Sequence, residues 1–447
     1  MAWLAIQVVA AVLFPFRCTA ASYNLRHGAL KSNEVFWLRL DNFNNVQYSA
    51  PLSVGGQTLP VIYDTGSFEI LVLSKLCHTC EARHAVYDQG KSTSFAATVP
   101  NVVTEHLFGS GPVVSQKGFE TVHLGGLDSQ YAVSHMPFWQ VLRHEIAVWD
   151  ENAHFSGIVG LGHPDRIPEG FATPGNRDVT LLSALKTHSF ALCLQRDAVD
   201  APGWLALGPN IDAMPNAAGS KFRKIDVVGE SHWAVGMFDF HVPGIQAADP
   251  CVPSCGAIID SGTSLIAAPP SALPIVKQLS SMVKKDCSNL HQLPVLRFRL
   301  GDQVVELPPK AYVMKNQYLV NNNLMDNVFG HDQTVQTECV PAFMTIQKNS
   351  NYGPVWILGM PFLRYYFTIF DRVAKQIFIT EATSTCQQAA SNGIFVNATQ
   401  GLNGPGTVSP GFAHSYSASD YEPNLIDPNG VRVPSWALDN SSASIRI

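Results

Sequence analysis

An aspartate-containing segment occurs twice in this sequence, and the repeat constrains the fold more than any other feature does. The segment Val61–Ser67, VIYDTGS, recurs as Ala257–Ser264, AIIDSGTS. A second landmark follows each copy at nearly the same distance, Ile158–Gly160 after the first and Ile357–Gly359 after the second. One Asp-hydroxyl-Gly triplet arises easily by chance, but two landmarks repeated with matched spacing do not. The sequence therefore predicts two homologous lobes, each with an aspartate at the end of an apolar strand.

The two repeated aspartates, Asp64 and Asp260, are candidates for acid–base chemistry. An aspartate commonly does no more than cap a turn, and a single copy would favour that interpretation. Two such turns facing each other across a lobe interface would bring two carboxyl groups together, and like charges at short distance do not both ionise easily. One carboxylate can then act as a general base on water while its protonated partner donates to a carbonyl. The pair predicts hydrolysis without a covalent intermediate, a metal or another cofactor.

The chain between these landmarks has the pattern of a mainly β protein. From about residue 46 to 382, short β-branched and aromatic runs are separated by glycine and proline. Two segments have helical signals instead: Asp178 is placed to cap a helix over Val179–Lys186, and Ser271 to cap a helix that extends to Val283. We expect strands at Leu59–Tyr63, Ile70–Leu73, Ala257–Ile259, Val355–Leu358 and Phe367–Phe370.

Composition excludes several classes of function. Basic residues number 29 against 35 acidic ones, a formal net charge of −6, so the chain lacks the positive charge that nucleic-acid binding requires. Hydrophobic residues make up 46% of the sequence and include 24 Phe, which supplies ample core and excludes disorder of the whole chain. Beyond the N-terminus no apolar run is long enough to predict a membrane span.

The two ends differ from the rest of the chain. Residues 1–20 carry an apolar run from Leu4 to Phe16 followed by small residues, which is typical of a secretory signal peptide. No lysine or arginine precedes the run, and a buried N-terminal strand is the alternative interpretation. Residues 386–447 are rich in Gly, Ser, Asn and Pro, which predicts a polar, disordered tail. Asn397 and Asn440 begin motifs for N-linked glycosylation.

Cysteine usage agrees with a secretory route. Of the nine cysteines, Cys18 would leave with the signal peptide, and the remaining even number favours disulfides. Spacing alone does not determine connectivity, but the candidate pairs are Cys77 with Cys80, Cys251 with Cys255, Cys287 with Cys339, and Cys193 with Cys386. Cys77, Cys80 and His84 also resemble half of a zinc site. No second ligand pair lies at a suitable spacing, so no metal site is predicted.

Taken together, these motifs resemble those of the pepsin-like (A1-type) aspartic proteases, over residues 48–382. The likeness rests on both aspartate turns, on Phe155–Leu161, on Cys251 and Cys255 shortly before Asp260, and on Trp356–Gly359. It implies a mainly β, bilobal fold of two homologous β-rich lobes, over residues 46–215 and 216–385, with an active-site cleft between them. It also implies a monomeric endopeptidase that cleaves polypeptides and is secreted or held in an acidic or secretory organelle.

The resemblance also implies roles for individual residues. Asp64 and Asp260 would be catalytic, and the residues that support them would be Thr65, Gly66, Ser67, Ser261, Gly262 and Thr263. In relatives the residues at Thr65 and Ser261 cross-bond beneath the carboxyls, and those at Ser67 and Thr263 support them. A bulky apolar substrate side chain would contact Ile62, Phe108, Gly109, Ser110, Phe155 and Ile158, although ordinary core is an equally good interpretation for the apolar ones. His232 would border the opposite subsite, with a plain surface or core histidine as the simpler alternative.

The hairpin that resembles the family's flap departs from the pattern at two positions. Most relatives have a tyrosine where this chain has Phe108, and its hydroxyl bonds a tryptophan where this chain has Leu71. Removal of one partner would orphan a polar group at about 1–3 kcal/mol, whereas replacement of both by apolar groups can be nearly neutral. We therefore expect apolar packing to hold this hairpin.

Residues 21–45 are too short for the basic propeptide that relatives carry. They form a short, pro-like segment with Arg26, Lys31 and Arg39 as its basic residues. We expect that activity does not require the loss of residues 22–45, and a signal-free form that stayed inactive until cut near Asn45 would contradict this. The alternative function is a catalytically weak or inactive binding or inhibitor protein. The altered hairpin and the short N-terminal segment favour that alternative, whereas the retained aspartates and hydroxyls favour the enzyme.

Overall fold

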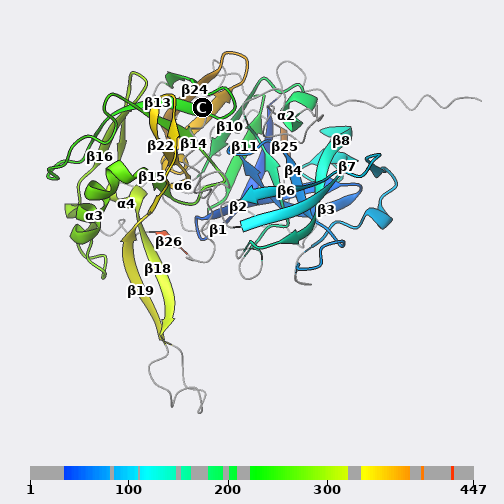
Figure 1. The fold of residues 1–447 in the computed structure, drawn as a ribbon, viewed down its shortest axis with the longest axis horizontal. Coiled ribbons are helices and arrows are strands. Elements are labelled where there is room, and N and C mark those ends of the chain that lie inside the picture. The colour runs from blue at the N-terminus through cyan, green and yellow to red at the C-terminus, as the bar shows by residue number, and fades with distance from the viewer. Residues whose placement is uncertain are drawn as a thin grey trace, which may run out of the picture.

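The computed structural model describes residues 35–80, 85–108, 111–146, 149, 153–162, 180–194, 201–208, 222–320, 334–382, 394–396 and 424–426. Within these ranges the protein is mainly β, as predicted, and two strand-rich bodies lie side by side (Figure 1). One is built from the blue and cyan strands of the N-terminal half, and the other from green and yellow strands of the C-terminal half. All five strands expected from the sequence are present.

The largest sheet in the described part of the chain has 15 strands and passes through both halves. Its order is β12-β24-β23-β10-β11-β1-β2-β3-β9-β4-β8-β7-β5, with β6 paired to β7 and β25 to β1. The strands are β1 (Phe36–Phe43), β2 (Gln47–Val54), β3 (Gln57–Asp64), β4 (Ile70–Leu73), β5 (Ala96–Ala97), β6 (Val103–Phe108), β7 (Gly111–Leu124), β8 (Ala132–His144), β9 (Gly157–Gly160), β10 (Ser189–Cys193), β11 (Gly203–Leu207), β12 (Arg223–Asp226), β23 (Tyr366–Asp371), β24 (Gln376–Glu381) and β25 (Ile394–Val396).

The C-terminal half contributes two further sheets within the described ranges. The first has eight strands in the order β17-β16-β13-β14-β22-β15-β20, with β21 paired to β22, and the second has the order β19-β18-β26. The β18–β19 hairpin projects away from the body of its lobe (Figure 1). The strands are β13 (Ala234–His241), β14 (Cys255–Ile259), β15 (Ile266–Ala268), β16 (Leu296–Leu300), β17 (Gln303–Leu307), β18 (Val313–Val320), β19 (Thr334–Pro341), β20 (Phe343–Thr345), β21 (Asn349–Ser350), β22 (Gly353–Leu358) and β26 (Asn424–Ile426).

Helices are short in the described residues, and their caps differ from the prediction. Thr180 caps α2, because its side chain accepts from the Ser183 N–H at 3.3 Å, and Asp178 lies outside the described residues. Ser271 lies inside a 3-10 turn, so Ala272 precedes α3 and provides no side-chain cap. The helices are α2 (Leu181–Ala184), α3 (Leu273–Met282), α4 (Pro309–Tyr312) and α6 (Met360–Leu363), and the 3-10 turns are η1 (Gln89–Lys91), η4 (Pro270–Ala272) and η5 (Leu290–Gln292).

The segment expected as a short pro-like piece at 21–45 contributes a strand to the largest sheet. β1 pairs with β11 and with β2, and Phe36, Leu38 and Leu40 are buried. The β1–β2 turn contains Asn44 and Asn45, both with positive φ, a conformation that asparagine tolerates better than most residues. In this structure residues 36–43 therefore belong to the same sheet as the strands that follow them.

The C-terminal tail also differs from the prediction. Two short pieces of residues 386–447, predicted to be disordered, form strands: β25 pairs in parallel with β1, and β26 with β18. The run Ile394–Val396 consists of apolar β-branched and aromatic residues that favour strands, which explains why it can extend a sheet. The glycosylation motifs at Asn397 and Asn440, and the signal segment 1–20, lie outside the described residues.

Strands from both halves of the chain meet in the largest sheet, and this junction joins the lobes. β23 from the C-terminal half pairs with β10 from the N-terminal half. The Trp233 ring makes edge-to-face contacts with the Phe190 and Phe370 rings. Its Nε1–H donates to the Leu161 carbonyl at 2.9 Å. One buried apolar cluster runs from Phe36 to Ile379, so the two lobes share a core.

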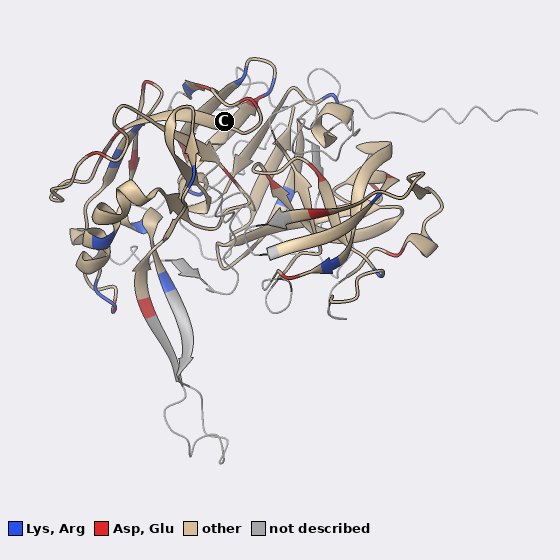
Figure 2. Cartoon of the chain, viewed as in Figure 1, with Lys and Arg blue, Asp and Glu red and all other residues tan. Residues whose placement is uncertain are grey.

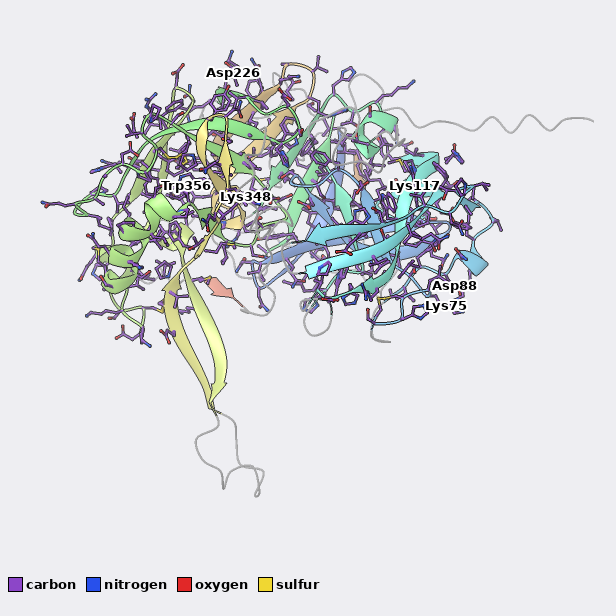
Figure 3. All side chains as sticks on the ribbon, viewed as in Figure 1. Lys75, Asp88, Lys117, Asp226, Lys348 and Trp356 are labelled. Atoms are coloured by element: carbon purple, nitrogen blue, oxygen red, sulfur yellow. A yellow bond between two sulfur atoms is a disulfide. The ribbon has the colours of Figure 1, made fainter. Side chains whose placement is uncertain are left out.

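Charged residues are scattered over the described part of both lobes (Figure 2). Lys75 and Asp88 form an ion pair at 3.0 Å at the edge of the N-terminal lobe (Figure 3), and exposed pairs of this kind contribute little stability. Lys117 is an exception because it is buried, with its Nζ 5.9 Å from the Trp139 ring centre. No helix in the described ranges is long and apolar enough to cross a membrane.

Three disulfides join described cysteines, and each matches a candidate pair from the sequence. They are Cys77–Cys80, Cys251–Cys255 and Cys287–Cys339. Cys193 is also disulfide-bonded. Its expected partner, Cys386, lies outside the described residues.

Candidate active site

The first repeated aspartate lies at the end of β3. The parallel strand β9 places Gly160 opposite Asp64, and the Leu161 N–H closes the turn by donating to the Asp64 carbonyl at 2.7 Å. A Cβ at position 160 would collide with the Phe68 backbone. The second landmark of the sequence repeat is therefore the strand against which the aspartate turn packs, and only glycine allows that approach.

The second aspartate has the same surroundings in the other lobe. β14 lies parallel to β22, and the N–H of Asp260, which follows β14, donates to the Leu358 carbonyl at 3.1 Å. A Cβ on Gly359 would collide with the carbonyl oxygens of Thr263 and Leu265. The repeat in the sequence is thus also a repeat in the structure.

Four buried hydrogen bonds join the two turns to each other. The Thr65 N–H donates to Ser261 Oγ, and the Ser261 N–H donates to Thr65 Oγ1, both at 2.9 Å. Each hydroxyl then donates across to a carbonyl, from Thr65 to Ile259 at 2.9 Å and from Ser261 to Tyr63 at 2.7 Å. Because every donor and acceptor in this set is paired, the two aspartates are fixed relative to each other.

The carboxyl groups face each other through glycine turns. The Gly66 N–H donates to Asp64 Oδ1 at 2.9 Å, and the Gly262 N–H donates to Asp260 Oδ1 at 2.7 Å. A Cβ on Gly66 would lie 2.6 Å from Asp260 Oδ1, and one on Gly262 would collide with the Asp64 carboxylate. Each carboxyl group therefore lies against the glycine of the opposite turn, and a side chain at either glycine would push the pair apart.

The electrostatics of the pair are asymmetric. Asp260 is completely buried, whereas Asp64 retains 6% exposure. Burial raises the pKa of Asp260 well above its usual 3.8, and the neighbouring negative charge of Asp64 raises it further. The bonds from the Thr263 hydroxyl, at 2.6 Å, and from the Gly262 N–H act in the opposite direction but do not cancel these effects. Burial and the charge beside it therefore both favour the protonated form of Asp260.

We predict that this raised pKa makes stability depend on pH. The folded chain binds a proton at Asp260 more tightly than the unfolded chain does, so the free energy of unfolding falls as pH rises from 3.8 towards the raised pKa. Asp260→Asn removes the titrating group. Its loss of stability between pH 4 and pH 7, measured by urea unfolding, should be smaller than that of the wild type by at least about 1.4 kcal/mol, the equivalent of one pKa unit.

The control for this prediction is Asp226→Asn, because the Asp226 side chain is 72% exposed and remote from the pair. Asp226→Asn should follow the wild-type pH dependence. If Asp260→Asn also follows it, Asp260 does not carry the raised pKa.

Ser67 does not support the carboxylate as expected. Its Oγ is buried without a hydrogen-bond partner among the described residues, whereas Thr263, the equivalent residue of the second turn, donates to Asp260. The Ser67 carbonyl instead accepts from the Gly162 N–H at 2.8 Å, which ties the turn to the chain beyond β9. Among the described residues, a hydroxyl side chain therefore supports Asp260 but not Asp64.

Three of the apolar residues expected to contact substrate are brought together. Ile62, Phe155 and Ile158 are buried in one cluster with Leu71 and Trp139, beside the strand that ends in Asp64. Phe108 belongs to β6, where its backbone pairs with Gly111, but its side chain is outside the described part of the structure. Gly109 and Ser110 also lie outside the described residues. His232 is buried and meets the Phe68 ring edge-on at 5.5 Å.

A polar contact near the pair was not predicted from the sequence. Glu69, in the turn after Asp64, accepts from Trp139 Nε1 at 3.0 Å and pairs with His106 Nδ1 at 3.2 Å. The His106 and Trp139 rings meet edge-on at 4.8 Å. This contact links β6 to the Asp64 turn by polar bonds, so apolar packing is not the whole of what holds the hairpin. The available signal was an acidic residue inside the apolar run Phe68–Leu73, since a carboxylate in such a run needs a partner.

Comparison with known proteins agrees with this geometry. The family model for eukaryotic aspartyl proteases matches residues 47–382. The chain belongs to the eukaryotic aspartyl protease family. It is 26% identical to pepsin II-1 of Oryctolagus cuniculus over 77% of this chain and 83% of that protein. Cathepsin D of Chionodraco hamatus is 28% identical over 80% and 87% of the two chains, and renin of Rattus norvegicus 28% over 76% and 80%.

The family match spans both copies of the repeat. The matched region contains both aspartate turns, both β-rich halves and all three described disulfides. β1, at residues 36–43, precedes the matched region although it belongs to the same sheet as β2 and β3.

Proposed function

We propose that this aspartyl protease family member is an endopeptidase that hydrolyses internal peptide bonds of proteins through Asp64 and Asp260. The observation that carries the proposal is the cross-bonded pair of turns. It fixes two carboxyl groups against each other and raises the pKa of one of them through burial and the other's charge. Two carboxyls with different protonation states are the requirement for combined acid and base catalysis.

In the proposed reaction, ionised Asp64 accepts a proton from a water molecule while the water oxygen attacks the carbonyl carbon of the substrate. Protonated Asp260 donates to the carbonyl oxygen, which gives a neutral tetrahedral intermediate. When the C–N bond breaks, Asp64 returns its proton to the leaving nitrogen and Asp260 recovers its proton from the hydroxyl. The products are a carboxylic acid and an amine, and the reaction uses no cofactor.

Substrate preference is proposed from the apolar cluster beside Asp64. Ile62, Phe155 and Ile158 belong to a buried apolar cluster at the end of β3, and a bulky apolar side chain next to the scissile bond would pack against the edge of this cluster. Polypeptides are the proposed partners, and the protein is proposed to act as a monomer. The signal-like N-terminus and the disulfides support a place in the secretory pathway, either secreted or in an acidic organelle.

Incubation of the purified chain with a denatured protein between pH 3 and pH 7, followed by mass spectrometry of the fragments, tests the proposal. An endopeptidase yields internal fragments, with bulky apolar residues enriched at the new ends. Intact substrate that copurifies with the chain at every pH would favour the alternative, a binding or inhibitor protein that has lost turnover.

We predict that Glu69→Gln weakens substrate binding more than it slows turnover. Glutamine still accepts from Trp139 but lacks the second carboxylate oxygen that faces His106 Nδ1, so β6 is held less firmly to the Asp64 turn. A loss of about 1 kcal/mol in binding corresponds to a roughly fivefold rise in KM, with kcat within about twofold. Steady-state kinetics on an apolar peptide measure both constants. Glu306→Gln, which alters an exposed pair with Arg297, is the control and should leave KM unchanged. An unchanged KM in Glu69→Gln would show that the contact does not position the hairpin.

A further inference from the structure

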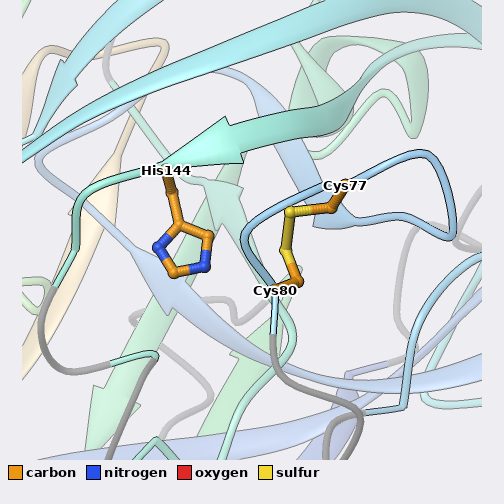
Figure 4. A group of neighbouring side chains, drawn as sticks. All are labelled: Cys77, Cys80 and His144. Carbon is orange, nitrogen blue, oxygen red and sulfur yellow. A yellow bond between two sulfur atoms is a disulfide. The ribbon is translucent and has the colours of Figure 1, made fainter.

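A second group of reactive side chains lies apart from the aspartate pair, at Cys77, Cys80 and His144 (Figure 4). The Cys77–Cys80 disulfide closes a loop after β4 in which the cysteines are three residues apart, and both cysteines are half-buried. His144 is the last residue of β8 and is buried. One nitrogen of its ring and both sulfurs lie within 4.8 Å of one another.

The hydrogen bonds of His144 determine which nitrogen faces the sulfurs. The Ile146 N–H donates to His144 Nδ1 at 3.3 Å, so the neutral ring carries its proton on Nε2. Figure 4 shows one ring nitrogen turned towards the disulfide and the other turned away. The nitrogen adjacent to the side-chain attachment is the one turned away, which leaves Nε2 on the side of the sulfurs.

Thr79, which lies between the two cysteines, holds the loop in this position. Its Oγ1 accepts from the His144 N–H at 3.0 Å and donates to the His144 carbonyl at 3.2 Å. The His78 N–H donates to the Leu142 carbonyl at 3.0 Å, which adds a second bond between the loop and the end of β8. These bonds hold the loop with the disulfide against the end of β8, the strand that carries the imidazole.

This arrangement suits a thiolate better than a metal ion. A metal ligand must offer a lone pair, but His144 Nε2 carries the proton as long as Nδ1 accepts from Ile146. An N–H directed at sulfur stabilises a thiolate instead, and cysteines beside an imidazole or in a C-x-x-C motif are the reactive ones. We propose that Cys77–Cys80 is a thiol–disulfide exchange site that reacts with small thiols of the glutathione class, with His144 stabilising the thiolate that is formed.

The exchange balances without any group beyond these thiols. The thiolate of one thiol molecule attacks a sulfur of the disulfide, the S–S bond breaks, and its electron pair remains on the other cysteine as a thiolate beside His144 Nε2–H. A second thiolate attacks the mixed disulfide and releases the remaining cysteine. The protein disulfide gains two electrons and two protons, and the two small thiols are oxidised to one disulfide.

The position of the loop connects this chemistry to the proposed cleft. Cys77 and Cys80 pack against the apolar cluster that contains Ile62, Phe155 and Ile158. Reduction would free the loop that covers one side of this cluster. This connection rests on the proposed function, and it predicts a several-fold higher KM for an apolar peptide in the double variant Cys77→Ser/Cys80→Ser. An unchanged KM in active enzyme would overturn the connection but not the exchange chemistry.

The exchange site is tested by graded reduction of the full chain with reduced glutathione, followed by alkylation and mass-spectrometric mapping of each cysteine. The other two described disulfides are internal controls, because Cys251 and Cys255 are both buried, and Cys287 pairs with buried Cys339. We expect Cys77–Cys80 to be reduced at least tenfold faster than either control. A rate equal to that of Cys287–Cys339 would overturn the proposal.

His144→Phe tests the role of the imidazole. The His144 and Trp149 ring centres are 5.2 Å apart, and phenylalanine keeps a ring beside Trp149 while removing the N–H. The rate at Cys77–Cys80 should fall about tenfold while the rates at the two control disulfides, which report on the fold, stay the same. An unchanged rate at Cys77–Cys80 would remove His144 from the proposal.

Tight uptake of one Zn²⁺ by the reduced chain, lost in His144→Phe, would show that Nε2 is a ligand and would overturn its assignment as a donor. The mapping does not require any peptidase activity of the chain itself, so its outcome is independent of the proposed function.

Discussion

Replacement of either Asp64 or Asp260 by asparagine is expected to lower kcat/KM for peptide cleavage by at least about a thousandfold. Proton transfer by a positioned acid or base contributes roughly 10²–10⁴-fold each, and the two carboxyls act as one unit, so loss of one disables both roles. Asparagine has nearly the same shape as aspartate and can keep the bond from the Gly66 or Gly262 N–H. The expected defect is therefore chemical. The measurement is steady-state cleavage of a peptide with bulky apolar residues at the scissile bond.

The matched control for these variants is Asp239→Asn, which alters an exposed pair with Arg299 on β13 and β16. It should retain the wild-type rate, and all three variants should give the wild-type circular dichroism spectrum. Retention of more than a tenth of the activity in Asp64→Asn or Asp260→Asn would show that the pair is not the catalytic centre.

Thr65→Val is expected to destabilise the fold by about 2–6 kcal/mol and to abolish cleavage. The Thr65 hydroxyl accepts from the Ser261 N–H and donates to the Ile259 carbonyl, so valine leaves two buried polar groups without a partner. Each orphaned group costs about 1–3 kcal/mol. Because these bonds join the two turns, their loss also removes what fixes the carboxyls relative to each other. Urea unfolding measures the first effect, and peptide cleavage the second.

Two variants make this test specific to the hydroxyl. Thr65→Ser keeps the hydroxyl and should restore most of the stability and activity. Thr187 is also buried, but its hydroxyl has no hydrogen-bond partner among the described residues, so Thr187→Val should change the free energy of unfolding by less than about 1 kcal/mol. An equal loss in Thr65→Val and Thr187→Val would mean that the cross-bonds do not matter.

The features that could be predicted from the sequence are those with a local pattern or a repeat. Strands such as Ile70–Leu73 are apolar and β-branched, and they form where the sequence indicates. The repeated Asp64 and Asp260 turns predicted two lobes because each copy carries its own supporting strand, at Gly160 and Gly359. The disulfide Cys251–Cys255 could be proposed because its cysteines are close in sequence.

Other features depend on partners that are distant in the sequence, and these could not be predicted. β1 pairs with β11, a strand far along the chain. Nothing within residues 36–43 indicates that pairing. The contact of Glu69 with Trp139 and His106 requires three elements to converge on one side chain. Ser67 differs from Thr263 although both follow the same motif, because the supporting bond depends on how each turn packs rather than on residue type.

The predicted helix caps were wrong for a more local reason. Asp178 and Thr180 are both good N-cap residues, and the sequence alone does not show which residue begins the helix. Thr180 caps α2 because the helix begins at Leu181. The interpretation of residues 386–447 as a disordered tail relied on average composition, which conceals a short apolar run such as Ile394–Val396.

The most direct test of the account is the dependence of kcat/KM on pH from 3 to 7 for the full chain. If the two carboxyls share one proton, the profile should be bell-shaped, with activity lost on the acid side when the pair gains a second proton and on the alkaline side when Asp260 ionises. The two limbs would belong to the pair as a whole. A profile that rises steadily to pH 7 without an alkaline limb would contradict a protonated Asp260, and with it the mechanism proposed for this site.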